Sequence, residues 1–220
     1  PTLVVLTLEN FHALNYEKEK NPPINRLDYA TPRNLVPATT LMDHQVEGVK
    51  WLIGTYNNGF PGALMADDMG LGKTLQALCF LSLYREQTPV QDLRPILIVA
   101  PTGLLNNWIK EITDHLGLEG LGVIEEAFGP RLKKLRTGSQ KGKDTDHGIA
   151  ILDVQKLQQM DVILTTYESL RDYQVSFSQL DLDCVIFDEI QKTKNPKSLL
   201  SCSARSLKGK FQIGLSGTPV

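Results

Sequence analysis

The sequence GALMADDMGLGKT, residues 62–74, places a glycine-rich turn directly after a short apolar run. Backbone amides of such a turn, at the start of a helix, cradle the phosphates of a nucleotide; a lysine reaches the β and γ phosphates, and a hydroxyl group holds Mg²⁺. Lys73 and Thr74 supply that lysine and that hydroxyl. The pattern therefore predicts a phosphate-binding loop for ATP and Mg²⁺. Its remaining nucleotide contacts are expected from Asp68, Met69, Gly70, Leu71 and Gly72.

The loop departs in one place from the general pattern G-x-x-x-x-G-K-[ST], because Asp67 stands where the first glycine is expected. Short patterns of this kind also occur in solvated glycine-rich turns that precede a helix and bind nothing. The nucleotide hypothesis therefore needs support from a second group of residues that the fold would bring to the same place.

Two carboxylates provide that support, because they follow a second apolar run. In CVIFDEIQ, residues 184–191, the run ends at Asp188 and Glu189. Ligands of open parallel sheets bind beyond the carboxyl ends of the strands, so both carboxylates are expected to face the phosphate loop. Asp188 is expected to hold Mg²⁺ through a water, and Glu189 to orient the water that attacks the γ phosphate. The predicted catalytic residues are thus Lys73, Asp188 and Glu189, and the predicted Mg²⁺ ligands are Thr74 and Asp188.

Apolar runs alternate with helical patterns along most of the chain. This alternation predicts an α/β fold with a doubly wound, mostly parallel sheet flanked by helices. Strands are expected at residues 62–65, 96–100, near 122, 162–165, before 188 and at 211–215; helices are expected at residues 42–56, 73–85, 104–116 and 198–207. Within 104–116, Leu104, Trp108 and Ile112 recur at helical spacing, which favours packing over base stacking for Trp108.

Composition shifts divide the chain. Residues 1–40 are rich in proline and carry a charge run, which predicts a partly extended lead-in segment with a strand at residues 3–8. Residues 41–220 are predicted to form one ATP-binding domain. Within it, residues 129–148 are predicted to form a basic surface loop, with contact to nucleic-acid phosphates as the alternative to a merely solvated charge run.

The overall composition limits the class of protein. The chain has 220 residues, of which 41% are hydrophobic, so it can bury a substantial core without disulfides. Its three cysteines lack metal-ligand spacing, and its apolar runs are too short for a bilayer span. These features predict an intracellular protein of the cytoplasm, nucleoid or nucleus with no membrane partner. The net charge of −2 does not exclude nucleic acid, because backbone amides and a few basic side chains along one groove suffice.

Six segments occur in the order and spacing of a known family. They are LMDHQVEGVKWL (41–52), ADDMGLGKT (66–74), LIVAPTGLLNNWIKEI (97–112), LTTYESL (164–170), DEIQ (188–191) and LSGTPV (215–220). Together they resemble the first RecA-like lobe of superfamily-two helicase ATPases, and in particular the Swi/Snf family of DNA translocases. Asp68 stands where the family more often has Glu, and Ile190 and Gln191 differ from the commoner residues after the Asp-Glu pair. These departures leave the subfamily open.

The resemblance implies roles for further residues. By analogy with the family, Gln45 would hydrogen-bond the adenine edge, for which an amide offers both a donor and an acceptor. Three threonines would contact DNA phosphates: Thr102, Thr165 and Thr166. A coupling group would pass the nucleotide state to a second lobe: Gln191, Ser216 and Thr218.

The activity implied by the resemblance is that of a DNA-dependent ATPase which translocates on duplex DNA and remodels protein–DNA complexes. A second RecA-like lobe, absent from residues 1–220, would bring the arginines that complete the site, so this lobe alone is expected to bind ATP but hydrolyse it poorly. The expected partners are duplex DNA, that second lobe and a protein bound on the DNA. Two alternatives stay open: an RNA helicase or other nucleic-acid translocase lobe, and a nucleotide-dependent scaffold without turnover.

Overall fold

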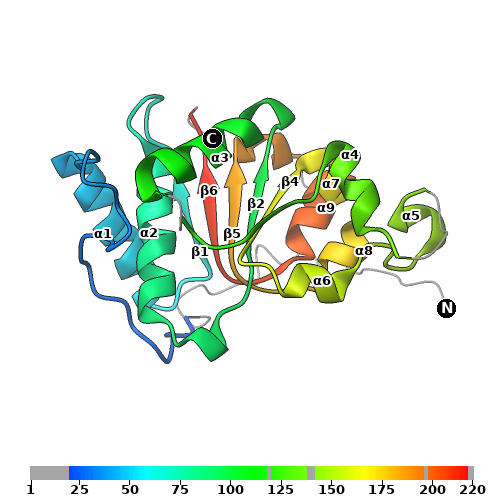
Figure 1. The fold of residues 1–220 in the computed structure, drawn as a ribbon, viewed down its shortest axis with the longest axis horizontal. Helices are drawn as coiled ribbons and strands as arrows, with labels where there is room; N and C mark the ends of the chain where they lie inside the picture. Colours follow the sequence, from blue (N-terminus) through cyan, green and yellow to red (C-terminus); the bar gives the residue numbers. More distant parts are fainter. Residues whose placement is uncertain (1–19, 118–119, 138–141, 196–197, 218–220) are drawn as a thin grey trace.

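A six-stranded parallel sheet forms the centre of the computed structural model, which describes residues 20–117, 120–137, 142–195 and 198–217 (Figure 1). The strands are β1 (Gly62–Met65), β2 (Ile96–Ala100), β3 (Ile124–Glu126), β4 (Val162–Thr166), β5 (Asp181–Asp188) and β6 (Lys208–Leu215). Their order across the sheet is β1-β6-β5-β2-β4-β3, and every pair of neighbours is parallel. The expected strand at residues 3–8 lies outside the described residues.

Helices cover both faces of the sheet. One face carries α1 (Asp43–Asn57), α2 (Lys73–Gln87) and α3 (Thr102–Leu116), and the other carries α6 (Val154–Gln158), α7 (Tyr167–Asp172), α8 (Gln174–Phe177) and α9 (Leu199–Arg205). The short helices α4 (Gly129–Leu132) and α5 (Asp144–His147) follow β3. The 3₁₀ helices are η1 (Val90–Asp92), η2 (Lys133–Leu135) and η3 (Ile190–Thr193). The predicted doubly wound α/β class is confirmed.

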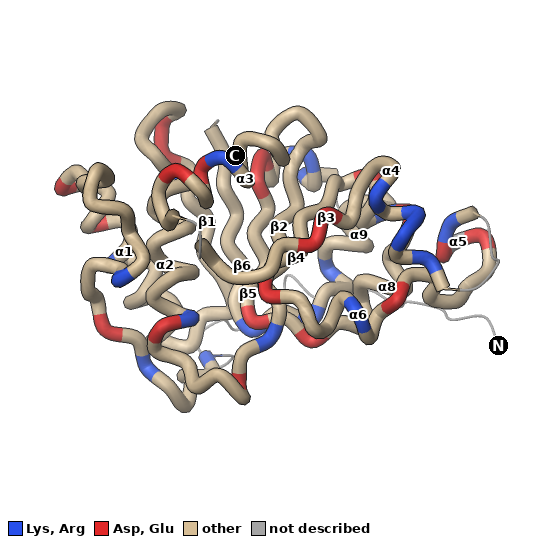
Figure 2. The backbone as a smooth tube through the Cα atoms, in the orientation of Figure 1, with Lys and Arg blue, Asp and Glu red and all other residues tan. Residues whose placement is uncertain are grey.

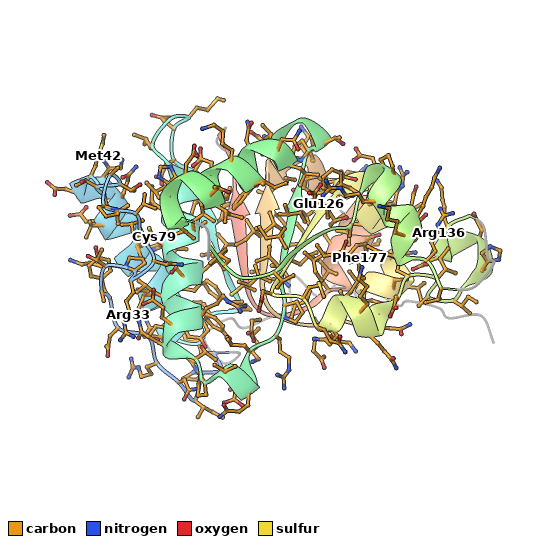
Figure 3. All side chains as sticks on the ribbon, viewed as in Figure 1. Arg33, Met42, Cys79, Glu126, Arg136 and Phe177 are labelled. Atoms are coloured by element: carbon orange, nitrogen blue, oxygen red, sulfur yellow. The ribbon has the colours of Figure 1, made fainter. Side chains whose placement is uncertain are left out.

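Alternation along the central strands explains the two layers of core. In β2, Ile96 and Ile98 pack with α1, α2 and α3, whereas Leu97 and Val99 pack with the helices of the opposite face. A strand buried on both faces reads as a continuous apolar run, which is why residues 96–100 and the run before Asp188 were predictable. Figure 3 shows the side chains that fill both layers, including Cys79 on α2 and Phe177 on α8.

The lead-in segment contributes to the first core layer although its described part, residues 20–40, forms no strand or helix. Leu27 is only 2% exposed, and its backbone N–H and C=O are both bonded to the side-chain amide of Asn57, at 2.8 and 2.7 Å. The backbone N–H of Arg33 donates to Glu86 Oε1 on α2. These contacts fasten the segment to α1 and α2.

Two local expectations differ from the structure in detail. The strand expected near Gly122 is present as β3 and begins at Ile124, whereas Gly122 itself, with a φ of +95°, lies in the bend before it. The segment 129–148 is more than a solvated loop, since Leu132 and Leu135 are buried in the second core layer. The short helices α6, α7 and α8 had no prediction, because four to six residues are too few to show a helical period.

A buried carboxylate fastens the end of this basic segment to α8. Asp144 has no exposed surface; its Oδ1 accepts the backbone N–H of Ile151 at 3.0 Å, and its Oδ2 accepts that of Ser176 at 2.5 Å. Burial raises the pKa of the Asp144 carboxyl, and the hydrogen bonds from Ser176 and Ile151 act in the opposite direction. The carboxylate thus satisfies two backbone donors that would otherwise be unpaired.

Asp144→Asn is expected to lower the free energy of unfolding by about 1–3 kcal/mol, because the amide turns a donor toward a backbone N–H that needs an acceptor. Denaturant unfolding followed by circular dichroism measures the difference. Asp114→Asn is the matched control, since Asp114 pairs with Lys110 on an exposed face of α3 and such pairs add little. Equal stability of the two variants would show that the bonds of Asp144 do not hold the segment.

Candidate functional site

A hollow of about 360 Å³ opens at the carboxyl ends of β1, β5 and β6. Four parts of the chain line it: the glycine-rich loop before α2, the inward face of α3, the end of β5 and the end of β6. The lining residues are Met69, Gly70, Gly72, Lys73 and Thr74; Leu104, Asn107, Trp108 and Glu111; Asp188 and Glu189; and Leu215, Ser216 and Gly217. The fold therefore brings the predicted phosphate loop and the predicted carboxylates to one site.

Glycine is required at the turn that begins α2. Gly70 and Gly72 have φ values of +86° and +72°, in the left-handed region that other residues rarely adopt. A Cβ on Gly72 would also lie 2.3 Å from Nε2 of Gln45, so the side chain of Gln45 would have to move. Gly70, Gly72, Lys73 and Thr74 all line the hollow, so the start of α2 borders the space in which a phosphate would bind.

The ammonium group of Lys73 is held by the backbone of the loop. Its Nζ donates to the backbone oxygens of Asp67 and Asp68, at 2.7 and 2.8 Å. Thr74, the next residue of α2, lines the same hollow and is half-buried. A positive charge and a hydroxyl group are thus placed together at the helix start, as the sequence pattern predicted.

Gln45 supports the loop from α1. The side chain is buried; its Oε1 accepts the backbone N–H of Met42 at 3.0 Å, and its Nε2 donates to the backbone oxygen of Leu71 at 3.4 Å. Gln76 donates to the same oxygen at 3.1 Å. Gln45 does not line the hollow, so its contact with adenine stays a prediction and its observed contacts are with the loop.

Asp188 is held on two sides. Trp108 Nε1 donates to its Oδ2 at 2.9 Å, and the hydroxyl of Tyr167 donates to its backbone oxygen at 2.7 Å. Burial raises the pKa of the Asp188 carboxyl, whereas the Trp108 hydrogen bond lowers it, the negative charge of Glu189 raises it and the positive charge of Lys73 lowers it. Trp108 is 2% exposed, so its predicted packing role is confirmed, but its bond to Asp188 was not predicted.

The residues around Asp188 fit a Mg²⁺ ion. A carboxylate and a hydroxyl group are hard oxygen donors of the type that Mg²⁺ prefers, and this ion keeps several waters, for which an open hollow leaves space. Asp188 and Thr74 line the same hollow from opposite elements, β5 and α2. Their chemistry matches the role predicted for them.

Glu189 has a backbone conformation that is unusual for its residue type. It has a φ of +55°, and no other non-glycine residue of the described chain has a positive φ. Its Oε2 accepts a hydrogen bond from Nε2 of Gln191, whose Oε1 accepts one from the Ser216 hydroxyl at 3.0 Å. The left-handed turn directs Glu189 toward the hollow, and Gln191 joins it to the end of β6. Two of the predicted coupling residues are thereby connected, whereas Thr218 lies outside the described residues.

The three threonines predicted to touch DNA differ in exposure. Thr102 is exposed at the first turn of α3. Thr166 is buried, at 5% exposure, and its Oγ1 caps α7 by accepting the backbone N–H of Ser169 at 3.0 Å. Thr165 has no exposed surface, and its hydroxyl donates to the backbone oxygen of Ala127 at 2.9 Å. A side chain without exposed surface cannot touch DNA in this conformation, so Thr165 is corrected to a structural residue.

Comparisons with known proteins agree with this arrangement. A model of the SNF2-related domain matches residues 44–220. The Zorya protein ZorD of Escherichia coli is 35% identical over 98% of the chain, and the ATP-dependent helicase FUN30 of Saccharomyces cerevisiae is 30% identical over 98% of the chain. The chain spans 21% and 18% of these relatives, about a fifth of their length.

Solved structures give the same result. The SWI2/SNF2 ATPase core of Sulfolobus solfataricus, in complex with dsDNA, superposes with a TM-score of 0.67 at 29% identity; the match covers 87% of this chain and 34% of that one. The same core domain solved separately gives a TM-score of 0.63 at 28% identity. With a family model that matches most of its length and with this RecA-like sheet, the chain belongs to the SNF2-related family.

Proposed function

We propose that this chain is the ATP-binding lobe of a DNA-dependent ATPase that translocates on duplex DNA and remodels protein–DNA complexes. One observation carries the proposal: Lys73, Thr74, Asp188 and Glu189, which come from two distant segments of the sequence, line one hollow at the carboxyl edge of the sheet. The exposed first turn of α3, with Thr102, begins at the end of the neighbouring strand β2.

Each of these side chains has a role in phosphoryl transfer. The loop amides and Lys73 would hold the phosphates of ATP, with Lys73 placed on the β and γ phosphates. Thr74 and Asp188 would hold Mg²⁺, which neutralises charge on the phosphates. Glu189 would orient the attacking water and accept its proton. Gln191 and Ser216 would pass the state of the site to the next lobe, together with Thr218.

The lobe alone would bind ATP and hydrolyse it poorly. Arginine side chains from a second RecA-like lobe would complete the site, and such a contribution is typically worth about 10³–10⁵ in rate. The Sulfolobus solfataricus core, solved with dsDNA, supports duplex DNA as the partner. A protein bound on the DNA would be the object moved, and the site of action would be intracellular, in the nucleoid or nucleus. Among the described residues, no helix is both long and apolar enough to cross a bilayer.

Steady-state ATP hydrolysis by the full-length protein tests the proposal, measured without nucleic acid and with duplex DNA, single-stranded DNA or duplex RNA. Stimulation by duplex DNA above the other arms is the expected result. Equal stimulation by RNA would favour an RNA helicase or another translocase. A scaffold would be favoured if no nucleic acid changed the rate of hydrolysis, or if the protein bound ATP without hydrolysing it.

The basic segment after β3 offers a second test. Figure 2 shows Lys and Arg following α4 along this segment. Arg131 pairs with Glu126, and Arg136 donates to the Tyr173 hydroxyl at 2.5 Å, so both have structural partners. Lys133 and Lys134 are exposed, so their ammonium groups are available to contact phosphates of nucleic acid.

Lys133→Ala/Lys134→Ala is expected to reduce the slope of log affinity for duplex DNA against log salt by about 0.9 for each phosphate that the variant no longer neutralises. Fluorescence anisotropy at several salt concentrations measures this slope. The control Lys50→Ala/Lys208→Ala removes the same charge from exposed positions on α1 and at the amino end of β6. If the Lys133→Ala/Lys134→Ala variant and the control have the same slope, the segment makes no contact with DNA.

A further inference from the structure

The hydrogen bond between Trp108 and Asp188 connects α3 to the proposed metal ligand. The indole Nε1 lies 2.9 Å from Asp188 Oδ2, and Trp108 is almost completely buried, at 2% exposure. A buried indole N–H usually finds an acceptor, and a bond to a charged carboxylate is about twice as strong as one between neutral groups. The bond spans 80 residues of sequence, so only the tertiary fold creates it.

The helix that carries Trp108 is firmly held. Leu104, Asn107, Trp108 and Glu111 line the hollow, and their spacing of three and four residues places them on one stripe of α3. Leu105, Ile112 and Leu116, on the same helix, are buried in the first core layer. A donor on a helix packed in this way keeps a fixed position relative to the end of β5.

Asp188 is half-buried in the wall of the hollow, and a fixed donor would set the direction of its carboxylate. A metal ligand must present its lone pairs in one direction, and partners outside the metal's own ligands commonly set that direction. Tyr167 fixes the backbone of Asp188 through its carbonyl oxygen, at 2.7 Å, but that bond does not reach the carboxylate. Trp108 restrains the carboxylate from a side chain of another helix, in addition to the local backbone hydrogen bond from Glu189, and it occupies one lone pair of Oδ2 while the others stay available for Mg²⁺.

We propose that Trp108 is a positioning residue, which orients the Asp188 carboxylate for Mg²⁺ binding through its indole N–H. The inference rests on the proposed function, because it assumes that Asp188 binds Mg²⁺ in the presence of nucleotide. The proposal distinguishes the packing of the indole ring from the hydrogen bond of its N–H. The ring packs in the wall of the hollow, and the N–H directs the carboxylate; phenylalanine keeps most of the first property and removes the second.

Trp108→Phe tests the proposal in the 220-residue chain. A fluorescent ATP analogue is titrated without Mg²⁺, in EDTA, and Mg²⁺ is then titrated at a fixed analogue concentration. The Mg²⁺ concentration at the midpoint is expected to be about tenfold higher than in wild type, because the variant loses one hydrogen bond to a charged group. Binding of the analogue in EDTA is expected to be unchanged. Trp51→Phe is the matched control, since Trp51 is the other tryptophan of the chain and lies half-exposed on α1.

A purely structural role would give a different result, because a disturbed wall would weaken binding in EDTA and in Mg²⁺ by the same factor. That result, or a Mg²⁺ midpoint equal to that of Trp51→Phe, overturns the proposal. If wild type itself binds no nucleotide at any Mg²⁺ concentration, the proposed function fails instead, so the two failures are distinguishable.

A second measurement covers the case in which Trp108→Phe does not fold. In the Trp51→Phe chain, Trp108 is the only indole, so its emission reports on this site alone. Addition of Mg²⁺ at saturating ATP is expected to change that emission with the same midpoint as the Mg²⁺-dependent binding of the analogue. Emission that does not respond to Mg²⁺ while the nucleotide binds would show that Trp108 is not connected to the metal site.

Discussion

Glu189→Gln is expected to lower ATP hydrolysis by the full-length protein by about 10²–10⁴, the usual contribution of a positioned general base, while nucleotide binding persists. Glu189 lines the hollow, and its left-handed backbone at φ +55° places it beside Asp188. Glutamine has the same size, and its amide oxygen can still accept the hydrogen bond from Gln191. The substitution therefore removes the base and leaves the connection to β6 intact.

The measurement compares DNA-stimulated turnover with equilibrium binding of an ATP analogue. Glu47→Gln is the control, because Glu47 is exposed on α1 and does not line this hollow. Loss of turnover with retained binding supports an ATPase. If turnover in Glu189→Gln matches the control, another group activates the water. If neither wild type nor variant turns over ATP under any condition, the scaffold hypothesis gains support.

The parts of the site that sequence could predict are those defined by local pattern. The run before Asp188 reads as a strand because β5 is buried on both faces, and the loop before α2 is recognisable as a candidate phosphate loop because its glycines and Lys73 are neighbours in sequence. Parallel strands then bring both to one edge of the sheet. No pairwise contact has to be known for that step.

The parts that sequence could not predict depend on contacts between distant residues. Helical spacing placed Trp108 in the core, but spacing does not reveal that its N–H meets Asp188. The threonines of LTTYESL look alike in sequence, yet the strand alternation of β4 and the position of β3 bury the Thr165 hydroxyl against Ala127. The adjacent residue Tyr167 drew no prediction, although its hydroxyl holds the Asp188 backbone.

Lys73→Ala is expected to weaken binding of Mg²⁺ and an ATP analogue to the chain by about a hundredfold or more. Hydrogen bonds to charged groups contribute about 1.5–3 kcal/mol each, and Lys73 would give up its contacts with two phosphates. The bonds from Nζ to the backbone oxygens of Asp67 and Asp68, at 2.7 and 2.8 Å, already hold the ammonium against the loop. Little ordering of the side chain is then required when the nucleotide binds.

Thermal unfolding should change little in Lys73→Ala, because Asp67 and Asp68 are exposed and water can replace the ammonium at their backbone oxygens. Lys50→Ala is the matched control, since Lys50 is exposed on α1 and lies over the Tyr29 ring. A loss of nucleotide affinity without a loss of thermal stability would show that Lys73 acts on the bound nucleotide and not on the fold. Equal affinity in both variants would mean that the nucleotide binds elsewhere or not at all. The roles proposed for Asp188, Glu189 and Trp108 would then fail as well, because all three assume one Mg²⁺–ATP site that includes Lys73.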